Sequence, residues 1–274
     1  MGVGARADHP GLGGFDLPDD HPGFSDRAYR LRRAAIAAAS SVAEARAPMI
    51  DYTTDEDDVW RTVKSALDAL HERYAVDEYR RGAAALDLPG DRVPQLRDVA
   101  ERLGTLTGWT VRAVPGLVPT REFYGALADR TFLATQYVRH PSVPFYTPEP
   151  DVIHELIGHV NGLASPRIAR LCEAAGRASL AATTDEALDR FSRVFWYTIE
   201  FGVVREHDRW RTYGAGLLSS FGEIQAFDTV DIRPFDIDEM IETPYDITRF
   251  QDVLFAADSF DDAEREVLAY FESA

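Results

Sequence analysis

Two histidines in one short segment, His154 and His159 of His-Glu-Leu-Ile-Gly-His, are the residues best suited to chemistry, because two converging imidazoles can hold one metal ion. They lie five residues apart. In a regular α-helix, five steps of about 100° turn the second side chain roughly 140° from the first. Both can reach one ion only if the helix is distorted. Gly158, directly before His159, is where the backbone could most easily end the helix or open a wide turn.

A third ligand decides which metal chemistry follows. Zinc proteases carry two histidines four apart with a glutamate general base between them, so a spacing of five weakens that interpretation. Two histidines and one carboxylate leave coordination positions open, as in non-heme Fe(II) oxygenases. Glu200 is the candidate carboxylate, because an ionised group in the otherwise apolar segment 195–204 would be costly to bury without a cation. The alternative is that both histidines make buried hydrogen bonds and Glu200 pairs with an arginine.

The composition indicates a soluble protein that does not bind nucleic acid or an anionic membrane surface. The formal net charge is −17, and both of those partners reward clustered Lys and Arg. The single cysteine, Cys172, excludes an internal disulfide and suits a reducing cytoplasm. No apolar run approaches the roughly 20 residues that span a bilayer, and the N-terminus lacks the order of a secretory signal. We therefore expect a cytoplasmic protein.

The elements that must position these residues are mainly helical, in a chain of 274 residues that we interpret as one domain over 23–274. Residues 1–22 are rich in Gly, Asp and Pro and are expected to form a flexible tail. The proline-rich stretch 141–150 is expected to be a loop that leads into the metal-binding helix. The patterns predict helices over 27–47, 54–79, 93–106, 121–129, 166–182, 186–204 and 261–271, a strand over 109–114 and a small sheet near 248–256.

Several separated blocks closely resemble the catalytic domain of the pterin-dependent aromatic amino-acid hydroxylases. Besides 154–159 and Glu200, they are Thr-Gln-Tyr-Val-Arg-His at 135–140, Tyr-Thr-Pro-Glu-Pro-Asp at 146–151 and Tyr-Gly-Ala-Gly-Leu-Leu-Ser-Ser-Phe-Gly-Glu at 213–223. The resemblance begins near His21 and extends to the segment around 258–263, with the blocks in the same order. It implies a mostly α fold with a small β component in a single catalytic domain.

The resemblance also implies an activity. Fe(II) held by His154, His159 and Glu200 would act with dioxygen and a tetrahydropterin, either tetrahydrobiopterin or a related reduced pterin, to form an Fe(IV)-oxo species that hydroxylates the ring of a free aromatic amino acid. The first choice is conversion of L-phenylalanine to L-tyrosine. The alternatives are tryptophan hydroxylation, phenylalanine meta-hydroxylation and, from other classes, a zinc-dependent hydrolase or a catalytically silent binding protein.

By the same resemblance, Arg139 binds the substrate carboxylate with two parallel hydrogen bonds and Asp151 orients it. For an isolated arginine in so acidic a chain, a surface ion pair would be the ordinary explanation. The ordinary role of Asp151 would be to cap the helix that carries His154.

Three further residues match positions around the substrate. Thr147 and Ser219 would line its amino-acid end, although Thr147 could equally be a loop cap and Ser219 the N-cap of a helix over 219–226. Trp196 precedes Glu200 by one helical turn, so its indole could pack on the substrate ring or simply belong to the core.

For the pterin, Phe123 matches an aromatic side chain that stacks on the ring, Glu155 matches an acid near it, and Val118 and Thr120 align with the loop at its edge. Without the resemblance, Phe123 would be a core residue and Glu155 a solvated acid on a helix.

Four positions depart from the animal enzymes of the family. Leu133 replaces a histidine near the pterin, Phe195 a tyrosine, Asn161 a proline after Gly-His-Val, and Leu254 an aromatic residue. The departures bear on the pterin used and on the ring position hydroxylated. The larger animal members also carry a regulatory domain and an oligomerising helix that this sequence lacks, so a monomer is expected.

Overall fold

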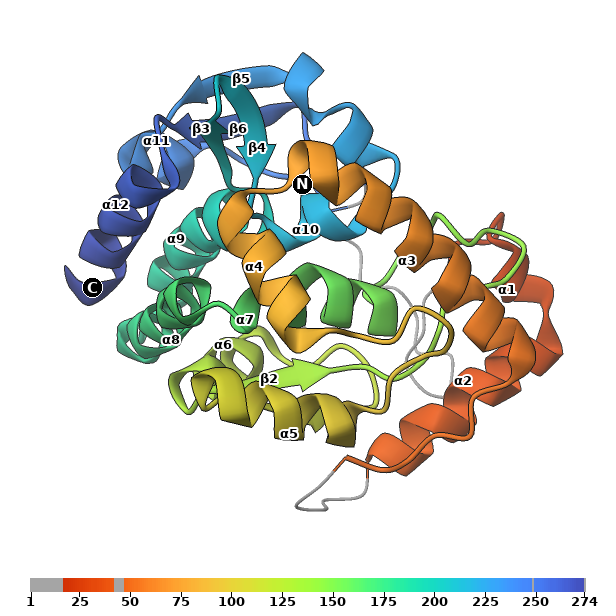
Figure 1. The fold of residues 1–274 in the computed structure, drawn as a ribbon. Coiled ribbons are helices and arrows are strands. Elements are labelled where there is room, and N and C mark those ends of the chain that lie inside the picture. Colours follow the sequence, from red (N-terminus) through yellow and green to blue (C-terminus); the bar gives the residue numbers. More distant parts are fainter. Residues whose placement is uncertain (1–16, 42–46, 248, 274) are drawn as a thin grey trace.

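Helices make up most of the protein and surround one buried segment. The computed structural model describes residues 17–41, 47–247 and 249–273. In Figure 1 the segment that carries His154 and His159 lies centrally, between α3 and α4 on one side and α5 on the other. These elements confirm the expected mostly helical domain with a small β component. The α-helices are α1 (Pro22–Ser25), α2 (Arg27–Ser40), α3 (Thr54–Tyr74), α4 (Asp77–Leu86), α5 (Leu96–Thr107), α6 (Thr120–Ala128), α7 (Asn161–Leu163), α8 (Pro166–Ala181), α9 (Asp185–Phe195), α10 (Ala215–Ser219), α11 (Ile237–Glu242) and α12 (Phe260–Ser273).

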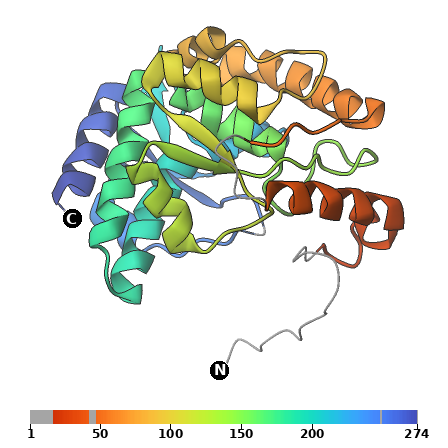
Figure 2. The ribbon, with the colours of Figure 1, turned by 90° about the horizontal axis from the view of Figure 1, so that it is seen from below.

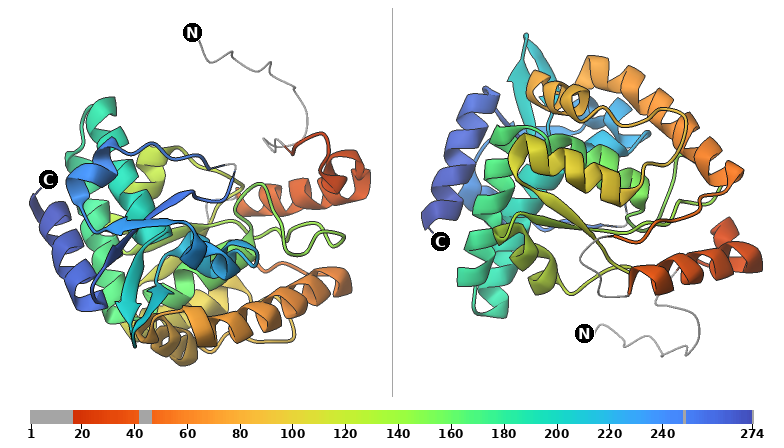
Figure 3. Two further views of the ribbon diagram at one scale, coloured as in Figure 1. Left: turned by 90° about the horizontal axis from the view of Figure 1, so that it is seen from above. Right: turned by 60° about the horizontal axis from the view of Figure 1, so that its bottom comes forward.

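Two small sheets complete the described fold. Strands β1 (Thr110–Ala113) and β2 (Thr131–Ala134) pair in parallel. The second sheet has the order β4-β3-β6-β5, formed by β3 (Val203–Glu206), β4 (Arg209–Thr212), β5 (Asp231–Pro234) and β6 (Val253–Ala257), and it lies at one end of the molecule in Figure 1. Figures 2 and 3 show α1 and α2 at one edge and α12 at the opposite edge. No helix in the described ranges is long and apolar enough to cross a membrane.

Helix α3 shows how the sequence builds the wall behind the site. It begins with a capping box, in which the Thr53 side chain accepts from the backbone N–H of Glu56 and the Glu56 side chain accepts from that of Thr53. Its apolar positions recur at helical spacing, so that one stripe faces the core. The buried residues of this stripe are Val59, Trp60, Val63, Leu67, His71 and Tyr74.

Two predicted helices end earlier than the sequence pattern indicates. The one expected over 54–79 is interrupted after Tyr74, because the backbone N–H of Val76 donates to the carbonyl of Thr212 in β4. The one expected over 186–204 ends at Glu200, and the last residues enter β3, which pairs with β4 and β6. In both places a hydrogen bond to a distant strand replaces the next helical bond.

The ends of other predicted elements also differ. Helix α2 ends at Ser40, and positions 42–46 of the predicted helix lie outside the described residues, as do positions 1–16 of the predicted tail. In the described part of that tail, Leu17 and His21 are buried. The alternative role for Ser219 as the N-cap of a helix over 219–226 is wrong, because Ser219 is the last residue of α10 and the next turn is the 3₁₀ helix η3 (Glu223–Gln225).

The distortion that the histidine spacing demands is present. Residues His154–Val160 form a π-helix, η1, and a second π-helix, η2, covers Trp196–Glu200. Gly158 lies in the wide turn, but its backbone does not have a positive φ. Glycine is required here because there is no room for a side chain. A Cβ at position 158 would lie 2.7 Å from the carbonyl oxygen of Ala215 in α10.

We expect Gly158→Ala to destabilise the protein by about 1–3 kcal/mol, because the added methyl group forces α10 away from η1. Chemical denaturation of both proteins would measure the difference. Gly104→Ala is the matched control, since a Cβ at this position in α5 would lie 3.6 Å from the nearest atom, in ordinary contact. Alanine in a helix interior should make this control slightly more stable. Equal stability of the Gly158 variant and the wild type would contradict the packing role.

Candidate active site

Three side chains from two separate segments meet at one point. His159 Nε2 lies 3.1 Å from His154 Nε2 and 3.2 Å from Glu200 Oε1. Donor atoms that bind one ion at ~2.1 Å lie about 3.0–3.4 Å apart, depending on the angle between them. The structure therefore brings together the three side chains selected from the sequence, at separations that fit one metal ion.

The two π-helices explain how these ligands converge. In a π-helix the hydrogen bonds join residues five apart, so side chains five apart come toward the same face. Such bonds join Asn161 N to Leu156 O at the end of η1 and Phe201 N to Trp196 O at the end of η2. The second π-helix, η2, has Glu200 as its last residue. Both ligand-bearing segments thus carry the same distortion.

Ser219 determines which nitrogen of His154 faces the centre. The Ser219 hydroxyl donates to the carbonyl of Ala215, 2.8 Å away, so its oxygen accepts from His154 Nδ1 at 2.8 Å. A proton on Nδ1 leaves the lone pair on Nε2, the nitrogen that faces His159 and Glu200. Ser219 was predicted to line the amino-acid end of the substrate pocket, and its hydrogen bond to His154 was not foreseen.

The charges at this centre suit a cation. Burial and the neighbouring His159 lower the pKa of His154 to about 4, which leaves its imidazole neutral at pH 7. Burial by itself would raise the pKa of Glu200, but the adjacent His159 holds it below its usual value. Burial by itself would lower the pKa of His159, but Glu200 raises it. A metal ion bound here would take the place of the proton on His159, because neutral imidazole and ionised carboxylate are the forms that bind metal ions. The donor set fits Fe(II), and two histidines with one carboxylate leave coordination positions open.

A second group with similar spacing, Asp77, Glu206 and His207, lies at the surface. Its contacts have an ordinary structural explanation. Glu206 accepts from the backbone N–H of Asp77 in the first turn of α4, and His207 Nε2 lies 3.0 Å from Asp77 Oδ2. Unlike the first group, it does not require an ion to account for a buried carboxylate.

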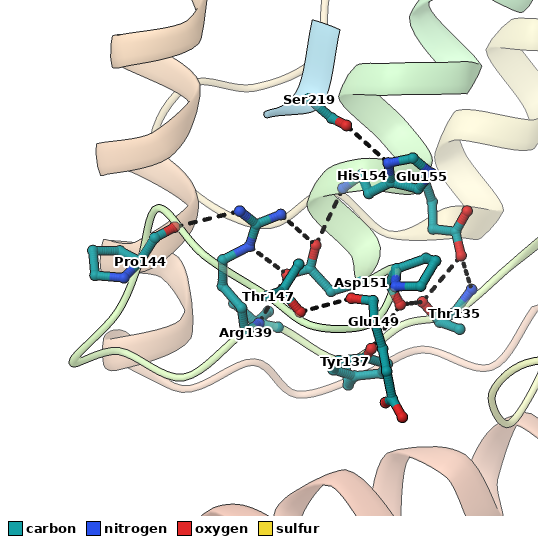
Figure 4. A network of polar contacts seen from close by, with 12 residues as sticks. Thr135, Tyr137, Arg139, Pro144, Thr147, Glu149, Asp151, His154, Glu155 and Ser219 are labelled. Atoms are coloured by element: carbon teal, nitrogen blue, oxygen red, sulfur yellow. Dashed lines mark hydrogen bonds and ion pairs between the residues drawn. The ribbon is translucent and has the colours of Figure 1, made fainter. Parts of the chain in front are cut away.

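Arg139 and Asp151 form a buried pair beside His154 (Figure 4). Arg139 is 4% exposed and Asp151 is fully buried, so the alternative of a surface ion pair is wrong. Arg139 Nε donates to Asp151 Oδ2 at 2.9 Å and Nη2 donates to Oδ1 at 2.7 Å. Burial would raise the pKa of Asp151, but the Arg139 guanidinium lowers it, so the carboxylate stays ionised. Asp151 also accepts from the backbone N–H of His154 and therefore caps the metal-bearing segment as well.

This pairing leaves one edge of the guanidinium available. Arginine has five N–H donors, and Asp151 occupies the Nε and Nη2 side. Nη1 makes a long bond of 3.5 Å to the carbonyl of Pro144. In the described contacts each terminal nitrogen uses one of its two N–H groups, which leaves one N–H on Nη1 and one on Nη2 to donate to a carboxylate.

The other predicted substrate residues lie in two different settings. Thr147 Oγ1 donates to the carbonyl of Glu149 at 2.6 Å, which is the loop-capping contact considered from the sequence. Trp196 is half-buried, stacks on Tyr245 with ring centroids 4.4 Å apart, and donates from Nε1 to Gln251 Oε1 at 3.0 Å. Gln251 holds the turn around Tyr245 by donating from Nε2 to the carbonyls of Asp246 and Arg249.

Among the candidate pterin residues, Glu155 differs most from expectation. It is buried rather than solvated, and its Oε1 accepts from both the backbone N–H and the hydroxyl of Thr135 (Figure 4). Burial raises its pKa to about 7. Phe123 is half-buried and touches Phe132, which itself lies against His159. Val118 is half-buried in the loop before α6, and Thr120 is the exposed first residue of that helix.

The four departures from the animal enzymes fall at buried positions. Leu133, Phe195 and Leu254 are all less than 4% exposed. Phe195 packs against Tyr124, with ring centroids 4.7 Å apart, and is the residue before η2. Asn161 follows η1, and its side-chain Nδ2 donates to the hydroxyl of Tyr79 at 3.2 Å.

Sequence reasoning gave no role to Thr135, Gln251 or Tyr79. Thr135 lies inside one of the matched blocks, so its position beside Glu155 could have been suspected. Gln251 and Tyr79 have no local pattern that marks them. Their partners lie 55 and 78 residues away along the chain, at Trp196 and Ile157.

Comparisons with known proteins agree with this geometry. The family model described as biopterin-dependent aromatic amino acid hydroxylase matches residues 12–274. A phenylalanine 3-hydroxylase of Streptomyces coeruleorubidus is 47% identical over 255 residues, which are 92% of this chain and 91% of that protein. The phenylalanine-4-hydroxylase of Rattus norvegicus is 40% identical over 94% of this chain, but this chain spans only 58% of that protein.

A solved structure gives the same result for the fold. The phenylalanine hydroxylase of Chromobacterium violaceum with bound iron(III) and 7,8-dihydrobiopterin superposes with a TM-score of 0.76 at 33% identity. The match covers 94% of this chain and 93% of that one. The extent of these matches, together with two histidines and a glutamate at one buried centre, shows that the chain belongs to the biopterin-dependent aromatic amino acid hydroxylases.

Proposed function

We propose that this protein hydroxylates the ring of free L-phenylalanine, using Fe(II), dioxygen and a tetrahydropterin. The observation that carries the proposal is the convergence of His154, His159 and Glu200 near a buried arginine that still has donors on Nη1 and Nη2 after pairing with Asp151. Both hydroxylases compared by sequence act on phenylalanine, as their names state. Iron with a reduced pterin supplies the activation of dioxygen, which is chemistry that side chains alone do not provide.

The protein contributes by holding the reactants. Arg139 binds the substrate carboxylate through its Nη1 and Nη2 edge, and Asp151 fixes the plane of the guanidinium. Ser219 keeps His154 in the tautomer that presents Nε2. Trp196 is packed against Tyr245 and Phe201, with ring centroids 4.4 and 4.6 Å away, so the part that it offers to the substrate ring is the edge of its indole. Such fixed contacts convert encounters between three reactants into reaction within one complex.

Phe123, Glu155, Val118 and Thr120 form the proposed pterin side. Phe123 supplies an aromatic face. It contacts Phe132, which packs against the metal ligand His159. Glu155, fixed by Thr135, supplies a carboxyl group whose pKa of about 7 allows it to hold or release a proton near neutral pH. The single buried Cys172 supports the proposal that the enzyme works in a reducing cytoplasm.

For the ring position we propose the para carbon, which gives L-tyrosine. Hydroxylation at the meta carbon is the second candidate, and one observation favours it: the Streptomyces 3-hydroxylase is 47% identical over nearly the whole chain. The two products have the same mass but different ring-proton coupling patterns, so NMR separates them directly.

The deciding experiment is anaerobic reconstitution with Fe(II), followed by dioxygen, a tetrahydropterin and phenylalanine, tryptophan or tyrosine in separate reactions. We expect a hydroxylated product from phenylalanine only when iron, oxygen and pterin are all present, with para-tyrosine dominant in the NMR spectrum. A larger yield from tryptophan would overturn the substrate. Hydrolytic turnover with Zn²⁺ in the absence of oxygen would overturn the reaction class.

Replacing Glu200 with Ala should abolish turnover and strongly weaken Fe(II) binding, because the carboxylate supplies the negative donor. Helical content should be preserved, as measured by circular dichroism alongside metal titration against a chelator. Glu186→Ala, at an exposed position in the first turn of α9, is the control and should bind iron like the wild type. Wild-type turnover in the Glu200 variant would show that Glu200 is not a metal ligand.

Replacing Arg139 with Lys should raise KM for phenylalanine roughly 10–100-fold, since one charge-assisted hydrogen bond contributes about 1.5–3 kcal/mol. A point charge does not reproduce the planar fork. The matched control is Arg177→Lys, where the arginine is exposed and pairs with Glu173 on the surface of α8. Steady-state kinetics of both variants measure KM for phenylalanine. An unchanged KM in the Arg139 variant would show that Arg139 does not bind the substrate.

A further inference from the structure

Helix α4 lies directly behind the segment that carries both histidines. The two come so close that a Cβ on Gly82 of α4 would lie 2.6 Å from the carbonyl oxygen of Asn161, at the start of α7. Tyr79, three residues before Gly82, is fully buried. Helix α4 can therefore touch the outer side of the π turn without any intervening layer.

The hydroxyl of Tyr79 makes two hydrogen bonds at this contact. It donates to the carbonyl oxygen of Ile157, 2.6 Å away, and it accepts from Asn161 Nδ2 at 3.2 Å. Ile157 lies inside η1, between the two histidines, and Asn161 follows its end. The hydroxyl thus joins the middle of the wide turn to its exit.

A second contact leads from the same tyrosine to the other side of the metal centre. The ring of His71 in α3 packs edge-on against the Tyr79 ring, with centroids 5.1 Å apart. His71 Nε2 lies 2.7 Å from the carbonyl oxygen of Leu218, the residue before Ser219. Ser219 accepts from His154 Nδ1. The corner between α3 and α4 therefore contacts η1 through Tyr79 and the residue next to Ser219 through His71.

We propose that Tyr79 is a positioning residue for the metal ligands, acting through its hydroxyl, which ties the carbonyl of Ile157 to the side chain of Asn161 and needs both bonds to do so. The inference rests on the metal centre of the proposed function and extends it to a residue that touches no ligand. A π turn is less stable than a regular α-helical turn, and it persists only where contacts from neighbouring elements hold it. Without the hydroxyl, the turn can relax toward α-helical geometry, in which His154 and His159 diverge.

The test is Tyr79→Phe, with Co²⁺ as the probe because its visible absorption reports the arrangement of its ligands and a cobalt complex of the Chromobacterium violaceum enzyme has been solved. We expect roughly tenfold weaker Co²⁺ binding, the lower end of the effect of removing an outer support. The absorption bands should shift, while circular dichroism stays unchanged. Tyr52→Phe is the matched control, since its hydroxyl also donates to a backbone carbonyl, that of Gln136, at 2.8 Å.

Wild-type affinity and an unchanged spectrum in Tyr79→Phe would overturn the inference, as would an equal change in the Tyr52 variant. If Tyr79→Phe does not fold, Asn161→Ala decides, because it removes one of the two partners of the hydroxyl and leaves the ring in place. A shifted Co²⁺ spectrum in that variant supports the inference, and an unchanged one overturns it. Failure of the wild type to bind Co²⁺ would instead count against the proposed metal centre itself.

Discussion

The structure depends on one geometric constraint, which is that two histidines five residues apart must face the same ion. A regular helix separates them, and η1 brings their Nε2 atoms to 3.1 Å by adopting the wider π geometry. Such a turn is less favourable than an α-helix and has to be held by its surroundings. It is held on one side by α10, which approaches as far as Gly158 allows, and on the other by α4.

The polar groups around this turn are arranged so that buried charges have partners. Asp151 accepts from Arg139 and from the backbone N–H of His154, and thereby ties the segment around Arg139 to the segment that carries both histidines. Breaking such a pair would leave an uncompensated buried charge, which is strongly destabilising. The contact that fixes the guanidinium of Arg139 therefore also fixes the start of η1. The proposed substrate-binding arginine and the segment that carries both histidines thus share one rigid support.

The helices were predictable where their stabilising contacts are local, as in the capping box and buried stripe of α3. Their ends were not predictable where the next hydrogen bond goes to a distant strand, as at Val76, which bonds to Thr212, and at Val203, which pairs with β4 and β6. The role of Ser219 was missed for a related reason. Nothing near it in the chain indicates that its oxygen accepts from His154, 65 residues away.

The sequence by itself determined the residue types that can bind iron, the need for a distorted helix, and the family through several blocks in order. These are properties of identity and spacing along the chain. Only the tertiary structure decided that Gly158 serves close packing, that Glu155 is buried, that His154 presents Nε2, and that Tyr79 supports the turn. Each of these depends on an atom from a segment far away in the chain, and such contacts arise only when the core closes.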